Sequence, residues 1–129
     1  MTKLNVLKAI DQIILRLWRP TTILLFFIIL FLSLYPLPKL PIMGGGVDKV
    51  YHFTAYLFLV LPISYAQPKY TRLYLFTMIL ISGIIEVIQP YFNRYGEWLD
   101  FLVNIIGIFI GFFLGKIIAK FIKNKIMMS

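Results

Sequence analysis

Several ionisable side chains of this protein could take part in acid/base chemistry, and their spacing shows how. Asp48 and His52 are four residues apart, so a helix would place both on one face. His52 is the only histidine, and because histidine titrates near neutral pH the two side chains could form an acid/base couple. Asp48 could instead be a helix N-cap beside an interfacial imidazole, since Asp is favoured at N-caps.

Glu86 is the strongest candidate for a functional carboxylate. It follows a long apolar segment and lies about one helical turn before Pro90, which is ~6 Å inside a helix that rises 1.5 Å per residue. A carboxylate at that depth in a membrane is costly and normally has a partner. It could have a perturbed pKa and a chemical role, or form a pair with Arg94 or His52 that only fixes helix packing. Glu86, His52 and Asp100 are the candidate catalytic groups, with no reaction assigned.

Other polar residues share helical faces with these groups. Tyr56 continues the face of Asp48 and His52, Gln89 shares a face with Glu86, and Asn104 follows Asp100 by one turn. We expect Arg94 to pair with neighbouring carboxylates, although it could also bind a phosphate. These helix ends together predict a polar pocket formed by Asp48, His52, Tyr56, Glu86, Gln89, Arg94, Asp100 and Asn104. The stripe continues as Gly107, Gly111 and Gly115, a doubled GxxxG pattern typical of closely packed membrane helices.

Cofactor motifs are weak or missing in the sequence. One histidine with several carboxylates would suit Mn²⁺ or Mg²⁺ as well as Zn²⁺, but no HExxH-like spacing supports a metal site. The chain contains no cysteine, which excludes disulfides and thiolate ligands. There is no phosphate-binding loop, dinucleotide fingerprint or nucleophile elbow. We therefore predict no metal and no other cofactor.

The elements that must position these residues are membrane helices. The chain is 60% hydrophobic with a mean hydropathy of +0.88, well above the composition of soluble domains. Long uncharged stretches approach the ~20 residues that a bilayer requires of a helix. We predict an all-α, polytopic membrane protein, a four-transmembrane-helix bundle with spans at residues 20–37, 51–67, 71–89 and 99–119.

The two ends of the chain are basic and need a separate interpretation. Apolar residues recur at helical spacing in residues 1–19, which predicts an amphipathic helix on the inner membrane surface. This helix could instead be continuous with the first span. The membrane domain then covers residues 20–119, and residues 120–129 form a basic cytoplasmic tail.

The distribution of charge predicts the orientation. The net charge is +8, and Lys and Arg gather before the first span, between the second and third spans, and after the fourth. Because short basic segments stay in the cytoplasm, both termini should be cytoplasmic and residues 38–51 and 90–100 should face outward. Contact with anionic lipid then explains the basic excess, and nucleic acid is not an expected partner. An aromatic belt is expected at the outer interface, formed by Tyr35, Tyr51, Tyr91, Tyr95 and Trp98.

The segments DKVYHFTAY and GIIEVIQPYFNRYGEWLDFLVNIIGIFIG resemble the VanZ-like family over roughly residues 45–115. The shared pattern is Asp-Lys-x-x-His, then Glu-x-x-Gln, an Arg, and Asp-x-x-x-Asn-x-x-Gly-x-x-x-Gly. The matching residues are Asp48, Lys49, His52, Tyr56, Glu86, Gln89, Arg94, Asp100, Asn104, Gly107 and Gly111. Glu97 departs from the small or polar residue common in the family. The resemblance implies a small protein of the bacterial inner membrane, with a relative linked to low-level teicoplanin resistance.

Three functions agree with these observations. The first is binding or altering a cell-envelope component, such as a lipid-linked cell-wall intermediate or an envelope protein, with an influence on glycopeptide (teicoplanin) susceptibility. The second is a membrane-embedded enzyme acting on a lipid or phosphate substrate. The third is a structural or partner-binding membrane subunit, or a small transporter, although transport would require polar groups across the whole span. The sequence leaves the oligomeric state open.

Overall fold

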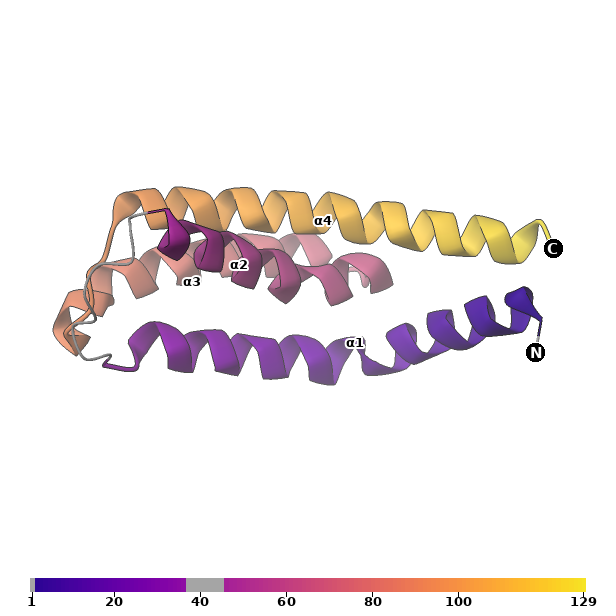
Figure 1. The fold of residues 1–129 in the computed structure, drawn as a ribbon, viewed down its shortest axis with the longest axis horizontal. Helices are drawn as coiled ribbons and strands as arrows, with labels where there is room; N and C mark the ends of the chain where they lie inside the picture. Colours follow the sequence, from indigo (N-terminus) through magenta and orange to yellow (C-terminus); the bar gives the residue numbers. More distant parts are fainter. Residues whose placement is uncertain (1, 37–45) are drawn as a thin grey trace.

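The structure, a computed structural model, describes residues 2–36 and 46–129 and is helical throughout its regular parts (Figure 1). The elements are α1 (Lys3–Leu34), α2 (Val47–Ala66), α3 (Thr71–Ile88), the short 3₁₀ helix η1 (Gln89–Phe92) and α4 (Trp98–Met127). The predicted all-α fold class is confirmed. Most of the segment 38–51 that is predicted to face outward lies outside the described residues.

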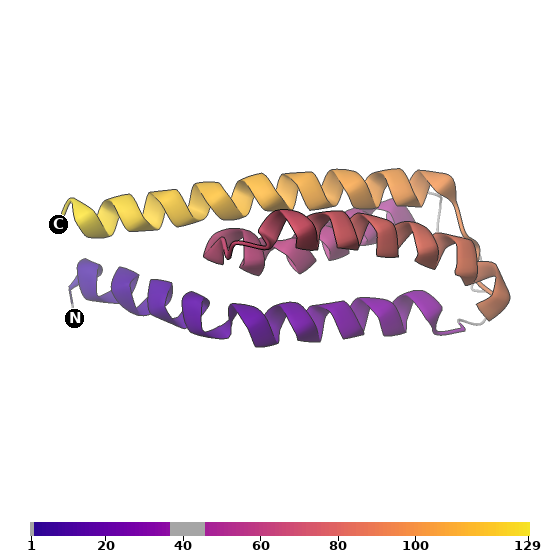
Figure 2. The same ribbon diagram turned by 180° about the vertical axis from the view of Figure 1, so that it is seen from behind.

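The helices alternate in direction along one long axis. α1 and α3 run toward the end that carries η1, whereas α2 and α4 run back toward the end where both termini lie (Figures 1 and 2). α2 and α4 are therefore parallel to each other, and they form the most extensive helix pair of the bundle. Because successive helices run in opposite directions, the start of α2, the end of α3 and the start of α4 lie at the same end of the bundle.

The glycine stripe of α4 explains how α2 approaches so closely. A Cβ atom added to Gly107 would lie 2.5 Å from the carbonyl oxygen of Phe53, and one added to Gly111 would lie 2.5 Å from that of Leu57. A Cβ atom on Gly115 would lie 2.6 Å from Cβ of Ser64. Only a residue without a side chain leaves room for the α2 backbone here, the arrangement typical of small-residue membrane interfaces.

α1 is one continuous helix from Lys3 to Leu34, so the structure shows the alternative in which the N-terminal segment joins the first span. Pro20 lies inside the helix and removes the hydrogen bond that its N–H would otherwise donate to the preceding turn. Residues 3–19 therefore do not form a helix separate from the first span. The expected tail is also partly helical, because α4 continues to Met127.

Packing explains why the N-terminal half of α1 continues in line with the span. Ile14 packs against a small core of Tyr65, Ala119 and Ile122, which come from the end of α2 and the second half of α4. The Tyr65 hydroxyl donates a hydrogen bond of 2.6 Å to the Asp11 carboxylate. The apolar face that predicted a helix on the membrane surface thus contacts protein, at least along this part.

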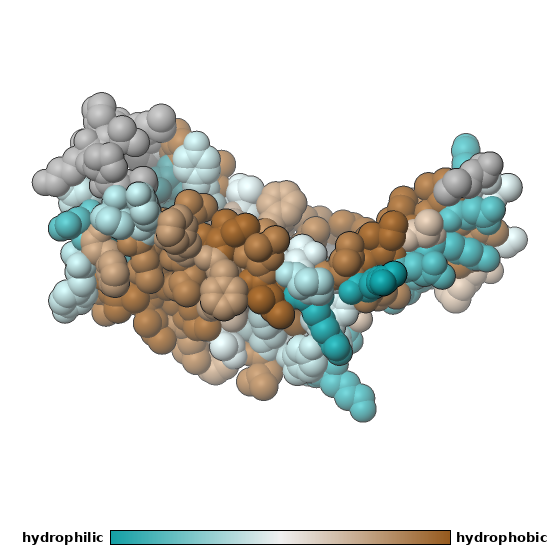
Figure 3. Space-filling model, turned by 90° about the horizontal axis from the view of Figure 1, so that it is seen from below, coloured by the Kyte–Doolittle hydropathy of each residue, from teal (hydrophilic) through white to brown (hydrophobic). Residues whose placement is uncertain are grey.

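The outer surface of the bundle is apolar, as a lipid environment requires. Large side chains such as Phe27, Leu73 and Phe113 are exposed on α1, α3 and α4. Figure 3 shows this apolar surface over the middle of one face, with hydrophilic residues gathering toward the end of the termini. Among the described residues, three helices are long and apolar enough to cross a membrane, Lys3–Leu34, Thr71–Phe92 and Trp98–Met127. The protein is therefore a membrane protein, and α2, which carries the polar DKVYH segment, does not meet the same criterion.

Candidate functional site

A cluster of polar side chains lies at the end of the bundle where α2 begins, α3 ends and α4 begins. Glu86 is 8% exposed, and Gln89, Asp100 and Asn104 are each 1% exposed. Buried polar groups need hydrogen-bond or charge partners, since leaving them unpaired costs free energy. Each of these buried side chains is therefore expected to have a hydrogen-bond or charge partner.

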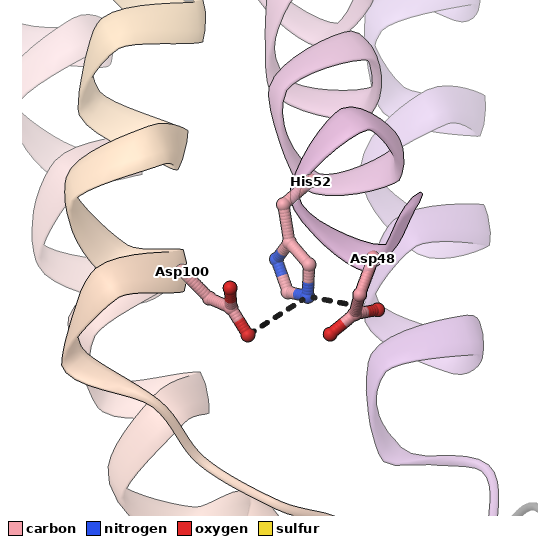
Figure 4. Close-up of side chains that lie close together, drawn as sticks. All are labelled: Asp48, His52 and Asp100. Atoms are coloured by element: carbon pink, nitrogen blue, oxygen red, sulfur yellow. Dashed lines mark ion pairs between the residues drawn. The ribbon is translucent and has the colours of Figure 1, made fainter. Parts of the chain in front are cut away.

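His52 lies at the centre of the cluster and contacts residues from all three helices. Its Nδ1 atom is 3.1 Å from Oδ1 of Asn104 and 3.7 Å from Oε1 of Glu86. Its Nε2 atom is 3.9 Å from Oδ1 of Asp48 and 3.7 Å from Oδ2 of Asp100 (Figure 4). The face that the Asp48–His52 spacing predicted does turn toward α4, because the glycine stripe holds α2 against that helix.

Lys49 supplies the cation of the cluster. Its ammonium group is 2.9 Å from Oε2 of Glu97 and 3.2 Å from Oδ1 of Asp100. Hydrogen bonds to these two carboxylates raise the pKa of Lys49 above its usual value. The sequence indicated Lys49 only as part of the VanZ-like pattern, and neither Lys49 nor Glu97 was predicted to belong to the pocket. The spacing in the sequence could have indicated it, because Lys49 precedes His52 by three residues. That spacing places Lys49 near the α2 face that carries His52.

Glu86 is held by groups other than the expected arginine. Its Oε2 atom accepts a hydrogen bond of 3.3 Å from the backbone N–H of Glu97, and its Oε1 atom accepts one of 3.5 Å from Asn104. Within residues 2–36 and 46–129 the side chain of Arg94 makes no ion pair, so its expected pairing with carboxylates is not seen there. Gly96 is also required for this arrangement, because a Cβ atom at that position would overlap the carbonyl oxygen of Glu86.

Gln89 and Tyr56 lie at the edges of the cluster. The Gln89 side chain donates a hydrogen bond of 3.2 Å to the carbonyl oxygen of Ser33, which links η1 to α1. Its own carbonyl oxygen, Oε1, is buried without a partner among the described residues. Tyr56 is buried one turn below His52 and packs in the main apolar core with Leu59 and Val60. Of the eight predicted pocket residues, the structure joins five by side-chain contacts, namely Asp48, His52, Glu86, Asp100 and Asn104. Tyr56 lies in the adjoining core, whereas Gln89 bonds to α1 and Arg94 makes no ion pair with the described residues.

Two grooves on the described part of the protein are apolar and lie away from the polar cluster. One is lined by Ile79, Gly83 and Phe101 between α3 and α4, and the other by Phe27, Phe31 and Phe92 beside α1. The polar cluster instead meets solvent at its rim, where Asp48 and Glu97 are more than half exposed. A ligand would therefore reach it from the end of the bundle.

The chemistry available here is acid/base chemistry or cation binding. Asp48, His52 and Asp100 each present one ligand atom, and these atoms lie within 4.8 Å of one another, a separation that could hold a metal ion. No other such group occurs in the part of the chain that the structure describes. The prediction of no metal therefore stays a prediction, and the geometry gives a reason to test it.

Comparison with known proteins supports the resemblance seen in the sequence. The family model described as VanZ/LLP1 matches residues 3–119, which include α1, α2, α3, most of α4 and every residue of the polar cluster. Searches of curated proteins and of solved structures gave no match. The family match covers most of the chain, and so this membrane protein belongs to the VanZ/LLP1 family.

Proposed function

We propose that this protein binds or alters a component of the cell envelope at the outer face of the cytoplasmic membrane and thereby influences susceptibility to glycopeptides such as teicoplanin. The observation that carries the proposal is the buried polar cluster of Glu86, Asp100 and Asn104 around His52. Ionisable groups within membrane helices are costly and usually have a functional role. The family match agrees with a role in the envelope.

The charge distribution supports an outward position for the cluster. Ten of the thirteen lysine and arginine residues lie in residues 3–19 of α1, in residues 69–72 at the turn into α3, or in residues 116–125 of α4. All three segments point toward the end of the termini in Figure 1. By the positive-inside rule this end is cytoplasmic, which puts the polar cluster outside.

The direction of the helices supports four crossings. α1 and α3 run in the same direction, so the chain must return across the membrane between them. α2 makes that return, and its 20 residues are ~30 Å long at 1.5 Å per residue, close to the thickness of a hydrocarbon core. Its polar first turn then lies at the outer interface, where burial among α3 and α4 shields it from lipid.

Exposed aromatic residues mark the same interface. Tyr35, Tyr51, Tyr91, Tyr95 and Trp98 are each at least half exposed, and all belong to helix ends or connections near the polar cluster. At the opposite interface Trp18 and Tyr70 pack together, with ring centroids 6.2 Å apart. Aromatic belts of this kind lie at the level of lipid headgroups. A ligand at the polar cluster would therefore be an envelope molecule within reach of the membrane surface.

An enzyme acting on a lipid or phosphate is the second candidate, and one observation favours it. His52 lies within 3.7–3.9 Å of three carboxylates, Asp48, Glu86 and Asp100. Such a group could move a proton to or from a bound substrate, since histidine and a carboxylate are the commonest general acid/base groups. Both candidates place the ligand at the same cluster and differ in whether the ligand is changed.

The test is teicoplanin susceptibility in a sensitive Gram-positive host, with vancomycin in parallel. Wild type, Glu86→Gln and Asp100→Asn are compared at matched membrane levels. Asp11→Asn is the control, because it makes the same chemical change at the opposite end, where Tyr65 can still donate to the amide oxygen. The proposal expects protection by wild type and Asp11→Asn and loss of protection by the two cluster variants.

Two results would count against the proposal. Equal protection by all four proteins would make the cluster structural. No protection by wild type would separate this protein from the envelope role of its family. Mass spectrometry of extracted envelope lipids from the same strains then separates the two candidates, because an enzyme changes the lipid composition and a binding protein does not.

A further inference from the structure

The orientation of the Asn104 amide fixes the proton on His52. Asn104 lies between Glu86 and His52, at 3.5 Å from the first and 3.1 Å from the second. Because a carboxylate oxygen accepts hydrogen bonds, the Asn104 NH₂ group must face Glu86, and the amide oxygen must face His52. The reverse orientation would bring two acceptor oxygens together. His52 Nδ1 therefore carries a hydrogen and donates it to Asn104.

The other ring nitrogen is then free to bind a cation. With Nδ1 protonated in neutral imidazole, Nε2 has a lone pair, and it faces Asp48 at 3.9 Å and Asp100 at 3.7 Å. Figure 4 shows Nε2 between these two carboxylates. Both distances are too long for hydrogen bonds. They approach the ~3.4 Å that separates ligand atoms around a tetrahedral ion with bonds of ~2.1 Å.

The charge of the cluster also calls for a cation. The cluster holds four carboxyl groups, on Asp48, Glu86, Glu97 and Asp100, and within residues 2–36 and 46–129 the one ammonium group that contacts any of them is that of Lys49. Lys49 contacts Oδ1 of Asp100, and Oδ2 of the same carboxylate is the atom that faces His52. Asp100 is 1% exposed, and among the described residues no hydrogen bond reaches its Oδ2 atom. Lys49 thus occupies only one of the two oxygens and leaves the other available.

We propose that Asp48 Oδ1, His52 Nε2 and Asp100 Oδ2 bind one divalent cation of the Zn²⁺ or Mn²⁺ class. One imidazole with two carboxylates suits these ions. The chain His52–Asn104–Glu86 is the outer-shell support that orients the imidazole, as is usual for histidine ligands. Three protein ligands leave at least one position open for water or a ligand atom.

The cation would explain how a carboxylate-rich cluster can bind an anionic envelope molecule. Without it, a phosphate would be repelled by the four carboxyl groups, whereas a divalent ion with an open position would attract a phosphate oxygen. This biological role rests on the proposed function. Binding of the metal itself does not, and it is measured without any envelope ligand.

The experiment is isothermal titration of purified protein in detergent micelles near neutral pH with ZnCl₂ and, separately, MnCl₂. Wild type is compared with His52→Gln, with Asp48→Asn at an exposed position that should not disturb folding, and with the control Glu97→Gln. The control changes a carboxylate beside Lys49 that is not a ligand. Intrinsic fluorescence of Trp18 and Trp98 during heating without metal verifies that each variant is folded.

The expected result is one ion per chain for wild type and Glu97→Gln, with affinity reduced at least about tenfold in Asp48→Asn and more in His52→Gln. No saturable binding of either ion by wild type would overturn the inference. Equal affinity of wild type and folded His52→Gln would also overturn it. Saturable metal binding by a wild type that gives no teicoplanin protection would instead count against the proposed function alone.

Discussion

Gly111→Ala tests whether the α2 backbone lies against α4 as closely as the structure has it. The added Cβ atom would be 2.5 Å from the Leu57 carbonyl oxygen and 2.7 Å from Cγ2 of Val60. An ordinary carbon–oxygen contact is ~3.3 Å, so α2 would have to withdraw by about 0.8 Å. The first contact is with backbone, which cannot rotate away, so the change is expected near the upper end of overpacking costs, about 3 kcal/mol.

Part of this loss is offset by helix propensity. Alanine in a helix interior is favoured over glycine by about 1 kcal/mol, which leaves a net destabilisation of about 2 kcal/mol. For a domain of this size 1 kcal/mol corresponds to about 4 °C, so Tm should fall by about 8 °C. A shift of α2 would also move His52 away from Asn104, whose contact of 3.1 Å holds the cluster together.

The assay is thermal unfolding in detergent micelles, followed by circular dichroism. Gly83→Ala is the matched control, because Gly83 is also inside a helix but its added Cβ atom would meet only the Phe101 ring, at 3.2 Å. That ring can rotate, so Gly83→Ala should leave Tm unchanged or raise it slightly. The reasoning is refuted if Gly111→Ala and Gly83→Ala melt at the same temperature.

Two further predictions concern the half of the protein that carries both termini and the proposed orientation in the membrane. Tyr65→Phe removes the hydrogen bond to the Asp11 carboxylate and should lower the free energy of unfolding by about 1.5 kcal/mol. The same melting assay measures this loss, and an unchanged Tm would mean that this hydrogen bond does not stabilise α1 against α2. The chain contains no cysteine, so Tyr95→Cys and Met128→Cys each introduce a unique thiol at an exposed position. A membrane-impermeant maleimide should label Tyr95→Cys in intact cells and Met128→Cys only after permeabilisation, and the reverse pattern would invert the proposed topology.

Much of the fold could be predicted from the sequence, because it depends on local patterns. The helices start close to the predicted positions for α2, α3 and α4, since apolar runs and prolines define them. The boundary predicted near Pro20 is absent, because packing of Ile14 against Tyr65 and Ile122 continues the helix across it. A sequence pattern shows that a helix face is apolar but does not say whether lipid or protein covers it.

The amino-acid sequence by itself determined which polar groups share a face. Helical spacing put Asp48 with His52 and Asp100 with Asn104, and it put the glycines in line with the latter pair. Those relations depend only on 3.6 residues per turn. The membrane class followed from composition in the same local way.

Only the tertiary structure decided which partners these groups have. Lys49, rather than Arg94, neutralises Asp100, and the backbone N–H of Glu97 reaches Glu86 because Gly96 lets the chain pass beside its carbonyl. These contacts join residues separated by up to 52 positions, as for His52 and Asn104. Their geometry depends on the rotation and register of α2 against α4, which arise from backbone contact along the glycine stripe and not from either helix alone.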